Sequence, residues 1–365
     1  MHWFYAPSFL PHSSQIHWAT GRDEETPADF GNPDEELHTL MEQAAWVDFS
    51  HMGMVQVAGP QRIDYFGGLT TQQVRQLAAD RTLYGALLTP QGRYLWDFTL
   101  VEYPTPEQLL LLTEPDRVPE LLQQLKLYIL RAKVQVADAR KTYGLMGIIG
   151  PQAEQAVGRL FPDLALAECP LGGSFTPRPG LRLWRDPRHE KFGWRLLLPA
   201  EQWITMGERF AAVLPMAGCS AWEGYRIHHG LPRGGNEWIA HETLPLEAGL
   251  QEMNGVDFNK GCYVGQETTA RTHYRATLKK RLFQVSGPAG FSCPSGTPVQ
   301  RDDGKEAGLI TSHHAPTGAG MALLRLTDVE NIPQHPLFAQ GQPLTVHKPS
   351  WARWNEVPGD SPLKG

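Results

Sequence analysis

The chain has 365 residues, of which 41% are hydrophobic and 20% charged, and its formal net charge is -6. This length is sufficient for two or three domains with a hydrophobic core, and the composition is that of a globular rather than a disordered chain. The acidic balance excludes a generic nucleic-acid-binding protein, because neutralising phosphates requires a basic surface.

The N-terminal segment and the cysteines indicate the compartment. Residues 1–33 are rich in proline, histidine and acidic residues and are predicted to form an irregular extension, without the basic region and unbroken apolar run of a signal peptide. No stretch has the length and apolar character of a membrane span. No C-x-x-C pair occurs among the cysteines, Cys169, Cys219, Cys262 and Cys293. We therefore expect a cytoplasmic protein with no membrane partner and no disulfide framework.

Helical and strand patterns alternate irregularly from residue 34 onward. Apolar spacing predicts helices near 34–45, 63–66, 121–129, 151–160, 201–214 and 220–231. Strands are predicted at 54–57, 83–89, 94–103, 109–112, 133–136, 145–149, 181–185 and 192–198, with a loop over 163–180. The regular strand-helix-strand rhythm of a doubly wound sheet is missing, so the expected fold class is α+β with mostly antiparallel sheets.

The C-terminal part has a different texture. Short strand candidates at 278–285, 297–300, 307–311, 321–326 and 343–346 are separated by glycine and proline. This pattern predicts an all-β barrel or sandwich of about 70 residues over 277–348, with a domain boundary near residue 277. Residues 349–365 are predicted to form a loose tail.

Asp97 is a candidate pocket residue. It lies on the second strand of a predicted hairpin, with Leu95, Thr99 and Val101 on its face of that strand. A carboxylate among such neighbours must be paired, hydrogen-bonded or directed into a cavity, because burying a lone charge is prohibitive. The alternative is an exposed acid on the solvent face of the strand.

A second candidate site is the run from Asn259 to Glu267, NKGCYVGQE. It places Cys262 beside Lys260, between two glycines and ahead of a stretch with helical character. A neighbouring cation or a helix N-terminus lowers the pKa of a thiol and favours the reactive thiolate. Glu267 and Arg271 are four residues apart, so they are expected to pair on one helix face. The alternative is a small buried cysteine in a turn shaped by the glycines.

Three chemistries are compatible with Cys262. A cysteine hydrolase needs a histidine base, yet none of the 14 histidines is fixed near Cys262 by the sequence. A metal or cluster site needs more ligands than one thiol, so we expect no resident metal and at most a cluster held transiently or with a partner. The third is thiol chemistry on a bound small molecule at the mouth of a pocket. The sequence leaves the last two open.

The run Lys260-Gly-Cys-Tyr-Val-Gly-Gln-Glu267, followed by Ala270-Arg271, resembles the signature of the YgfZ family. These are folate-binding proteins of the aminomethyltransferase-like superfamily that are needed for maturation or repair of iron-sulfur enzymes. Further matching runs, at 244–247, 253–255 and 280–283, are most similar to the mitochondrial branch of that family. The N-terminal part is similar to the T-protein of the glycine cleavage system in Asp48-Phe-Ser-His-Met-Gly53, Gly59-Pro60 and Leu88-Thr-Pro-Gln-Gly92.

The resemblance covers about residues 36–347 and implies a three-domain ring with a folate-sized central channel. Residues 34–276 would form the folate-binding region with two α+β subdomains, and 277–348 a C-terminal β-barrel. It further implies a tetrahydrofolate or other folate ligand, with iron-sulfur assembly proteins and [4Fe-4S] client enzymes as partners. Separately from the resemblance, we expect a monomer. Cys262, Lys260 and Asp97 would be the catalytic residues. The folate-binding residues would be Asp97, Tyr263, Gln266, Glu267 and Arg271.

Two departures from the T-protein pattern bear on activity. T-proteins carry two adjacent acids where this chain has Trp96-Asp97, and related sequences often place an acid for the pterin ring where this chain has His228-His229. T-proteins also lack the Cys262 signature. The leading hypothesis is therefore a folate-dependent iron-sulfur maturation factor in which Lys260 activates Cys262. The alternative is a tetrahydrofolate-dependent one-carbon transferase in which Asp97 orients an amine, and a third possibility is a non-catalytic scaffold for assembly partners.

Overall fold

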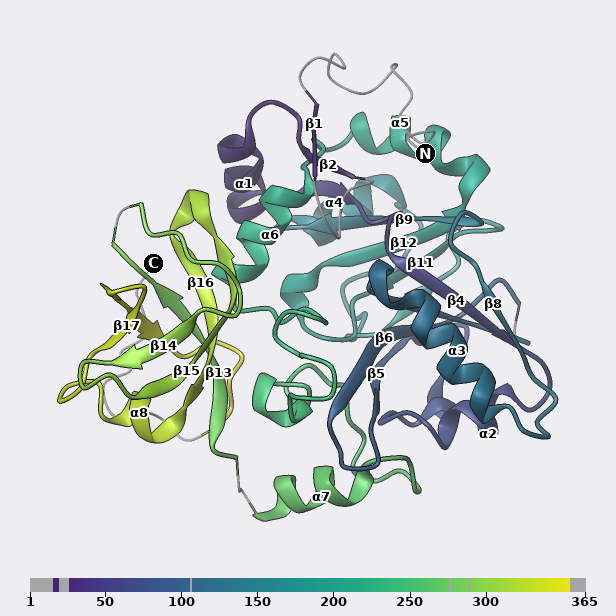
Figure 1. Ribbon diagram of the computed structural model, residues 1–365. Helices are drawn as coiled ribbons and strands as arrows, with labels where there is room; N and C mark the ends of the chain where they lie inside the picture. Colours follow the sequence, from purple (N-terminus) through teal and green to yellow (C-terminus); the bar gives the residue numbers. More distant parts are fainter. Residues whose placement is uncertain (1–15, 20–25, 106, 276–277, 289, 355–365) are drawn as a thin grey trace. The chain divides into compact units, whose positions relative to one another are not determined.

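A computed structural model describes residues 16–19, 26–105, 107–275, 278–288 and 290–354 of the chain (Figure 1). The chain forms two compact units. The first is made of residues 1–87, 96–225 and 254–264, and the second of 88–95, 226–253 and 265–365. None of the helices in the described ranges is long and apolar enough to cross a membrane.

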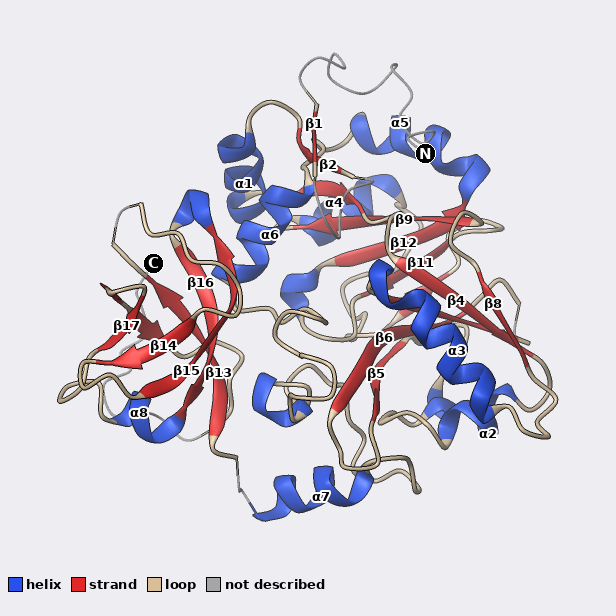
Figure 2. Cartoon of the chain, in the orientation of Figure 1, coloured by secondary structure: helices blue, strands red, loops and turns tan. Residues whose placement is uncertain are grey.

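Two five-stranded sheets, built mostly of antiparallel strands, form the framework of the first unit (Figure 2). One has the order β5-β6-β7-β4-β8, with β4 Gly53–Ala58, β5 Leu83–Leu88, β6 Tyr94–Glu102, β7 Gln108–Thr113 and β8 Gln135–Asp138. The other has the order β10-β11-β12-β9-β3, with β3 Ala45–Asp48, β9 Tyr143–Ile149, β10 Ser174–Phe175, β11 Arg182–Arg185 and β12 Trp194–Pro199.

Helices cover these sheets with their apolar faces. They are α1 Pro33–Glu42, α2 Arg62–Gly67, α3 Val118–Tyr128, α4 Ala153–Leu160, α5 Trp203–Ala211 and α6 Cys219–His228, with the short 3-10 helices η3 Val74–Gln76 and η5 Glu190–Phe192. Helices α4 and α5 share one core with β9 and β12. Its centre is Trp46, which is fully buried and makes edge-on contacts with the rings of Trp203 and Phe210.

The second unit holds a seven-stranded antiparallel sheet in the order β18-β17-β14-β15-β16-β13-β19. Its strands are β13 Lys280–Ser286, β14 Pro298–Arg301, β15 Glu306–His314, β16 Ala319–Arg325, β17 Leu337–Ala339, β18 Gln342–Pro343 and β19 Thr345–His347. The two edge strands, β18 and β19, are separated only by Leu344, so the sheet nearly closes on itself as a barrel. Outside the barrel the unit contains α7 Gln266–Arg275, α8 Leu326–Glu330 and η7 Pro245–Ala248.

The predicted fold class, α+β with mostly antiparallel sheets and a C-terminal barrel, is confirmed. Each strand predicted between residues 54 and 198 has a counterpart. The helix predicted over 34–45 ends at Glu42, because Ala45 begins the buried strand β3 and pairs with Ile149. The loop predicted over 163–180 contains the short strand β10, which pairs with β11.

The two chain ends differ in part from the expectation. Of the predicted irregular extension, residues 1–15 and 20–25 lie outside the described residues. The remainder includes β1 His17–Trp18 and β2 Pro27–Asp29, which pair antiparallel. His17 Nδ1 also lies 2.7 Å from the Asp29 carboxylate. Residues 276–277, at the predicted boundary, and 355–365 of the predicted tail also lie outside the described residues. Residues 349–354 are not loose, since Trp351 is buried and donates a 2.9 Å hydrogen bond to the Gly230 carbonyl.

Candidate functional site

Residues 254–264, which contain the first part of the KGCYVGQE motif, are bound into the first unit by backbone contacts. Thr71 Oγ1 donates to the Gly255 carbonyl at 2.5 Å, and the Asp257 amide donates to the Thr71 carbonyl at 3.0 Å. Gln72 Nε2 donates to the Asn254 carbonyl at 2.8 Å. The segment entering the motif is therefore fixed against the turn that follows α2, rather than being a free loop.

Lys260 is the deepest anchor of this segment. It is 8% exposed, and its ammonium donates to the Gly67 carbonyl at 2.7 Å and to the Thr70 carbonyl. The same ammonium lies 4.8 Å from the centroid of the Tyr263 ring, a cation-π contact. Burial lowers the pKa of Lys260 to about 8, and Asp257 partly opposes this shift. The cation is thus directed into the protein, where it holds the motif in place.

Cys262 lies at the surface between two buried anchors. Lys260 precedes it, Tyr263 is 9% exposed, and the thiol residue itself is exposed. At Gly261 an added Cβ would meet no atom within 4 Å, so the chain faces open space at this point. The alternative of a small buried cysteine is therefore wrong. A thiol in this position is accessible to a partner molecule.

The rest of the motif begins α7 in the second unit. Gln266 is the first residue of that helix, and Tyr263 and Cys262 belong to the first unit. The predicted pairing of Glu267 with Arg271 is confirmed, at 3.1 Å, with both side chains largely exposed. Also in the second unit, His228 and His229 contact each other edge-to-face with ring centroids 5.1 Å apart.

Asp97 is buried on β6, and its carboxylate is hydrogen-bonded. It is 7% exposed, and the Tyr84 hydroxyl on the neighbouring strand β5 donates to its Oδ2 at 2.7 Å. Thr113 Oγ1 on β7 donates to the Asp97 backbone carbonyl at 2.7 Å. The alternative of an exposed acid on a solvent face is therefore wrong. The predicted requirement that a carboxylate among such neighbours be hydrogen-bonded is met by Tyr84.

A charged cluster beside Asp97 was missed by sequence reasoning. Arg188 holds Asp186 with two parallel hydrogen bonds of 2.9 and 2.8 Å, and the Arg195 guanidinium lies 3.7 Å from the same carboxylate. Burial alone would raise the pKa of Asp186, yet the two guanidinium groups hold it below its usual value. Burial lowers the pKa of Arg195 to about 10. In the sequence, the only signal for this cluster was the presence of Asp186, Arg188 and Arg195 close to or within the strands predicted at 181–185 and 192–198.

Aromatic rings flank both arginines. The Arg188 guanidinium lies 3.6 Å from the centroid of the Phe192 ring and 5.4 Å from that of Tyr84. The Arg195 guanidinium lies 4.5 Å from the Phe49 ring. Tyr84 thus contacts Arg188 through its ring and Asp97 through its hydroxyl. These contacts join the carboxylate of Asp97 to the arginine cluster in one buried polar group.

This group also reaches the segment that carries Cys262. Gln72 Nε2 donates to the Tyr84 carbonyl at 2.9 Å as well as to Asn254, and Asn254 Nδ2 donates to the Arg188 carbonyl at 3.3 Å. The two sequence candidates, Asp97 and the Cys262 segment, are therefore connected through a short series of hydrogen bonds in the first unit. Among the described residues, no set of three or more His, Cys, Asp or Glu side chains is arranged to hold a metal ion.

Comparison with known proteins places the chain. The family model described as the GCVT N-terminal domain matches residues 2–180, and that of the CAF17 C-terminal beta-barrel domain matches residues 279–354. The tRNA-modifying protein YgfZ of Vibrio vulnificus is 30% identical over 307 residues, which cover 82% of this chain and 89% of that protein. The chain belongs to the YgfZ family.

Mitochondrial proteins are similar to this YgfZ-family chain at comparable levels. The iron-sulfur cluster assembly factor IBA57 of Mus musculus is 29% identical, covering 84% of this chain and 86% of its own length. The IBA57 homolog of Dictyostelium discoideum is 26% identical, and the match covers 66% of this chain and 62% of that protein. Among solved structures, the glycine cleavage system aminomethyltransferase T of Bartonella henselae superposes with a TM-score of 0.77 over 93% of this chain and 94% of its own, at 17% identity. The YgfZ-family chain thus has the aminomethyltransferase fold.

Proposed function

We propose that the protein is a folate-binding factor in the assembly or repair of iron-sulfur clusters in [4Fe-4S] enzymes, and that Cys262 is its working thiol. The observation that carries the proposal is the exposed thiol of Cys262, held between the buried anchors Lys260 and Tyr263 in a chain similar to iron-sulfur cluster assembly factors. A thiol that is presented by a rigid support and open to solvent suits a reaction on a partner protein.

The chemistry of a single thiol limits what Cys262 can do. Thiolates are the ligands that iron-sulfur clusters use, but a cluster needs four of them or their equivalents. Cys262 therefore acts together with ligands from a partner protein. It either binds one iron of a cluster during transfer, or replaces a ligand of the cluster in the client enzyme. On this proposal the partners are iron-sulfur assembly proteins and [4Fe-4S] enzymes, and Lys260 supports the reaction by positioning the thiol.

The first unit offers groups of the kind that a folate requires. The edge of a pterin ring carries N–H groups that donate hydrogen bonds to a carboxylate, and the faces of the ring stack on planar groups. Asp97 has a buried carboxylate, one oxygen of which accepts a hydrogen bond from the Tyr84 hydroxyl. Planar groups lie near it, among them the Arg188 guanidinium and the Phe192 ring. Asp97 would hold the pterin edge, and Tyr263, Gln266, Glu267 and Arg271 remain the proposed contacts for the rest of the ligand. Bound tetrahydrofolate would supply a carrier for a one-carbon unit.

The proposed thiol role is tested in cells whose only copy of the gene encodes Cys262→Ser. We expect the activities of [4Fe-4S] enzymes to fall to the level of a deletion strain, with normal abundance of the variant. Cys219→Ser is the matched control, because it makes the same substitution at a cysteine that is partly exposed but lies outside the motif. This variant should retain wild-type activity. Wild-type [4Fe-4S] enzyme activity in the Cys262→Ser strain would contradict the thiol role.

The folate part of the proposal has its own experiment. Purified wild-type protein is titrated with tetrahydrofolate by calorimetry, alongside Asp97→Asn and Cys262→Ser. Asp97→Asn should weaken binding, because an amide replaces the proposed acceptor for the pterin edge, whereas Cys262→Ser should bind as wild type does. No heat of binding with the wild type would remove folate from the proposal and favour a scaffold for assembly partners.

A one-carbon transferase is the second candidate, favoured by the fold match to an aminomethyltransferase and by the burial of Asp97. In that case Asp97 would orient the amine of a donor on tetrahydrofolate, and no thiol would be needed. Turnover of an aminomethyl or methylamine donor by purified protein, lost in Asp97→Asn and unchanged in Cys262→Ser, would establish this function in place of the first.

A further inference from the structure

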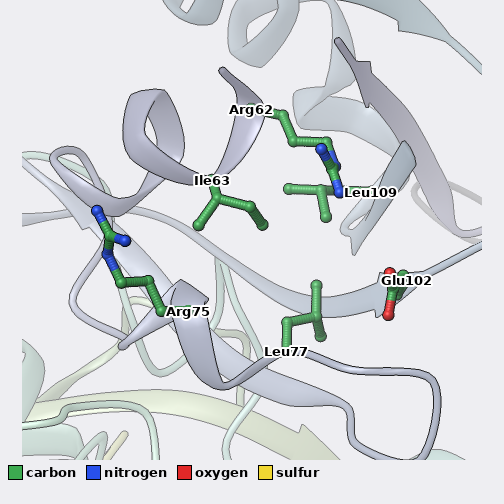
Figure 3. A pocket seen from close by; sticks show the side chains of 6 residues that line it. All are labelled: Arg62, Ile63, Arg75, Leu77, Glu102 and Leu109. Carbon is green, nitrogen blue, oxygen red and sulfur yellow. The ribbon is translucent and has the colours of Figure 1, made fainter. Parts of the chain in front are cut away.

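A cavity of about 290 Å³ opens in the first unit, between α2, the turn at η3 and the adjoining ends of β6 and β7 (Figure 3). Small-molecule pockets in proteins range upward from about 300 Å³, so this cavity suits a ligand at the small end of that range. Six side chains line it: Arg62, Ile63, Arg75, Leu77, Glu102 and Leu109. None of them belongs to the proposed thiol or folate site.

Three apolar side chains form the middle of the cavity. Ile63 from α2 and Leu77 after η3 point toward each other, and Leu109 of β7 lies beside them (Figure 3). Leu109 is fully buried and belongs to the core. Because Leu109 is fully buried, the accessible apolar surface that a small hydrocarbon group can cover is that of Ile63 and Leu77, which are partly exposed.

Two opposite charges lie on the same side of this apolar surface. Glu102 ends β6, and the Arg62 guanidinium lies on the same side of the cavity (Figure 3). Within the described residues, the Glu102 carboxylate accepts no hydrogen bond, although the backbone carbonyl of Glu102 accepts one of 3.1 Å from Arg182. Partial burial raises the pKa of Glu102 against the attraction of Arg62 and Arg182. A cationic hydrogen-bond donor in the cavity would offset that cost of burial.

Arg75 contributes differently. Its guanidinium is largely exposed, is paired with Asp64, and lies on the other side of the apolar group from Glu102 (Figure 3). Its charge is already balanced by a partner. The Arg62 guanidinium also donates a 3.3 Å hydrogen bond to the Gly59 carbonyl. The charges on the Glu102 side of the cavity thus include one carboxylate and one guanidinium, next to a hydrocarbon wall (Figure 3).

We propose that this cavity binds a small zwitterion with an apolar side chain, of the α-amino acid class. Its ammonium is bound by Glu102, its carboxylate by Arg62, and its side chain packs on Ile63 and Leu77, above the buried Leu109. The two groups attached to the α-carbon of an amino acid carry opposite charges, so they suit a small cavity that presents a carboxylate and a guanidinium on the same side. Charge-assisted hydrogen bonds fix the orientation, and the hydrocarbon wall selects for an apolar side chain.

The first experiment titrates the full chain with L-leucine by calorimetry. Three comparison ligands each lack one feature: 4-methylpentanoate has no ammonium, 3-methylbutylamine has no carboxylate, and glycine has no hydrocarbon side chain. Leucine should bind at least tenfold more tightly than 4-methylpentanoate or 3-methylbutylamine, since a charge-assisted hydrogen bond contributes roughly 1.5–3 kcal/mol, which is a factor of about 10 to 100. Leucine should also bind more tightly than glycine, because glycine buries no hydrocarbon on Ile63 and Leu77. Absence of leucine binding at millimolar concentration, or equal binding of 4-methylpentanoate, would overturn the proposal.

Variants then test the location. Glu102→Gln and Arg62→Gln should each weaken leucine binding at least tenfold, whereas Arg75→Gln, on the opposite side of the same cavity, should change it less than twofold. If either variant fails to fold, amide chemical shifts of the wild type replace it: leucine should shift resonances of residues 62–67 and 102–109. Shifts elsewhere, or unchanged binding by a folded Glu102→Gln, would refute the site. Cys262→Ser should bind leucine as wild type does, so this result is independent of the proposed thiol function.

Discussion

The Lys260 ammonium donates a 2.7 Å hydrogen bond to the carbonyl oxygen of Gly67, which lies 193 positions earlier in the chain. The motif that carries Cys262 is thereby held by a buried cation on the turn after α2. A buried ammonium bonded to two carbonyls is directed away from solvent, whereas Cys262 is exposed. Lys260 therefore determines where the thiol is presented. The protonation of its ammonium should also be measurable, because it makes the free energy of unfolding depend on pH.

Stability should depend on pH through Lys260. Burial holds its pKa at about 8, below the ordinary 10.5. Between these values the unfolded chain binds more protons than the folded chain, so the folded state gains stability as pH rises. We expect the free energy of unfolding of the wild type, minus that of Lys260→Met, to increase across this window by up to about 3 kcal/mol, measured by urea unfolding at a series of pH values.

The matched control for this measurement is Lys126→Met, because Lys126 is exposed on α3 and its substitution leaves the buried carbonyls untouched. The difference between wild type and Lys126→Met should be flat over the same pH range. A Lys260→Met difference that decreased with rising pH would mean that the ammonium is stabilised by the fold, contrary to its burial.

The four cysteines should react in an order set by exposure. Cys262 is exposed, Cys219 is partly exposed, and Cys169 and Cys293 are buried. Burial also raises the pKa of Cys169, which lowers its thiolate fraction. In a time course with iodoacetamide, followed by peptide mass spectrometry, Cys262 should be labelled first and Cys219 second. Labelling of Cys169 or Cys293 at the rate of Cys262, without denaturant, would contradict this arrangement.

Local patterns were sufficient to predict most strands. The hairpin of β5 and β6 and most of the barrel strands follow from alternation and turn residues, which depend on neighbours in sequence. Asp97 was recognisable because a single acid in an apolar strand needs a partner. Its partner, Tyr84, is 13 positions away on the paired strand, and nothing in the spacing identified that residue.

The rest of the site depends on contacts between distant segments. Arg188 and Asp186 lie in a loop between β11 and β12, where charged residues are common, and their burial follows from packing beneath Tyr84 and Phe192. The direction of the Lys260 side chain likewise depends on carbonyls that lie almost 200 positions earlier. Sequence proximity suggested that Lys260 faces Cys262, whereas the three-dimensional contacts of Lys260 are with Gly67, Thr70 and Tyr263.

Two ion pairs in the second unit have the same length and should differ in energy. Arg226–Glu237 and Arg271–Glu267 both measure 3.1 Å, but the first pair is almost completely buried and the second is exposed. Glu237→Leu leaves the Arg226 charge buried without its partner, and we expect a loss of about 3–5 kcal/mol in the free energy of unfolding. Glu267→Leu should cost less than about 1 kcal/mol.

Adding Arg226→Met to Glu237→Leu should recover part of the loss, because the double variant buries no charge. Urea unfolding of the wild type and these three variants, followed by circular dichroism, provides the comparison. Equal costs for Glu237→Leu and Glu267→Leu would show that burial does not govern these pairs.

Trp351 should be a stabilising residue of the second unit, although it lies only 14 residues from the end of the chain. Its side chain is buried, its indole N–H donates to Gly230 O, and its ring packs against Gly249, where an added Cβ would lie 2.6 Å from the ring. Trp351→Ala should cost about 3–5 kcal/mol in the free energy of unfolding. Gly249→Ala should also destabilise, because of this clash and because Gly249 has a φ of +83°.

The two substitutions should be non-additive, which separates a specific contact from a general loss of packing. Once Trp351 is alanine, Gly249→Ala no longer meets the indole ring, and only the strain of its left-handed backbone remains, about 1 kcal/mol. Thermal unfolding of the two single variants and the double variant measures the coupling. If Gly249→Ala costs the same with and without the tryptophan, the ring does not occupy this position against Gly249.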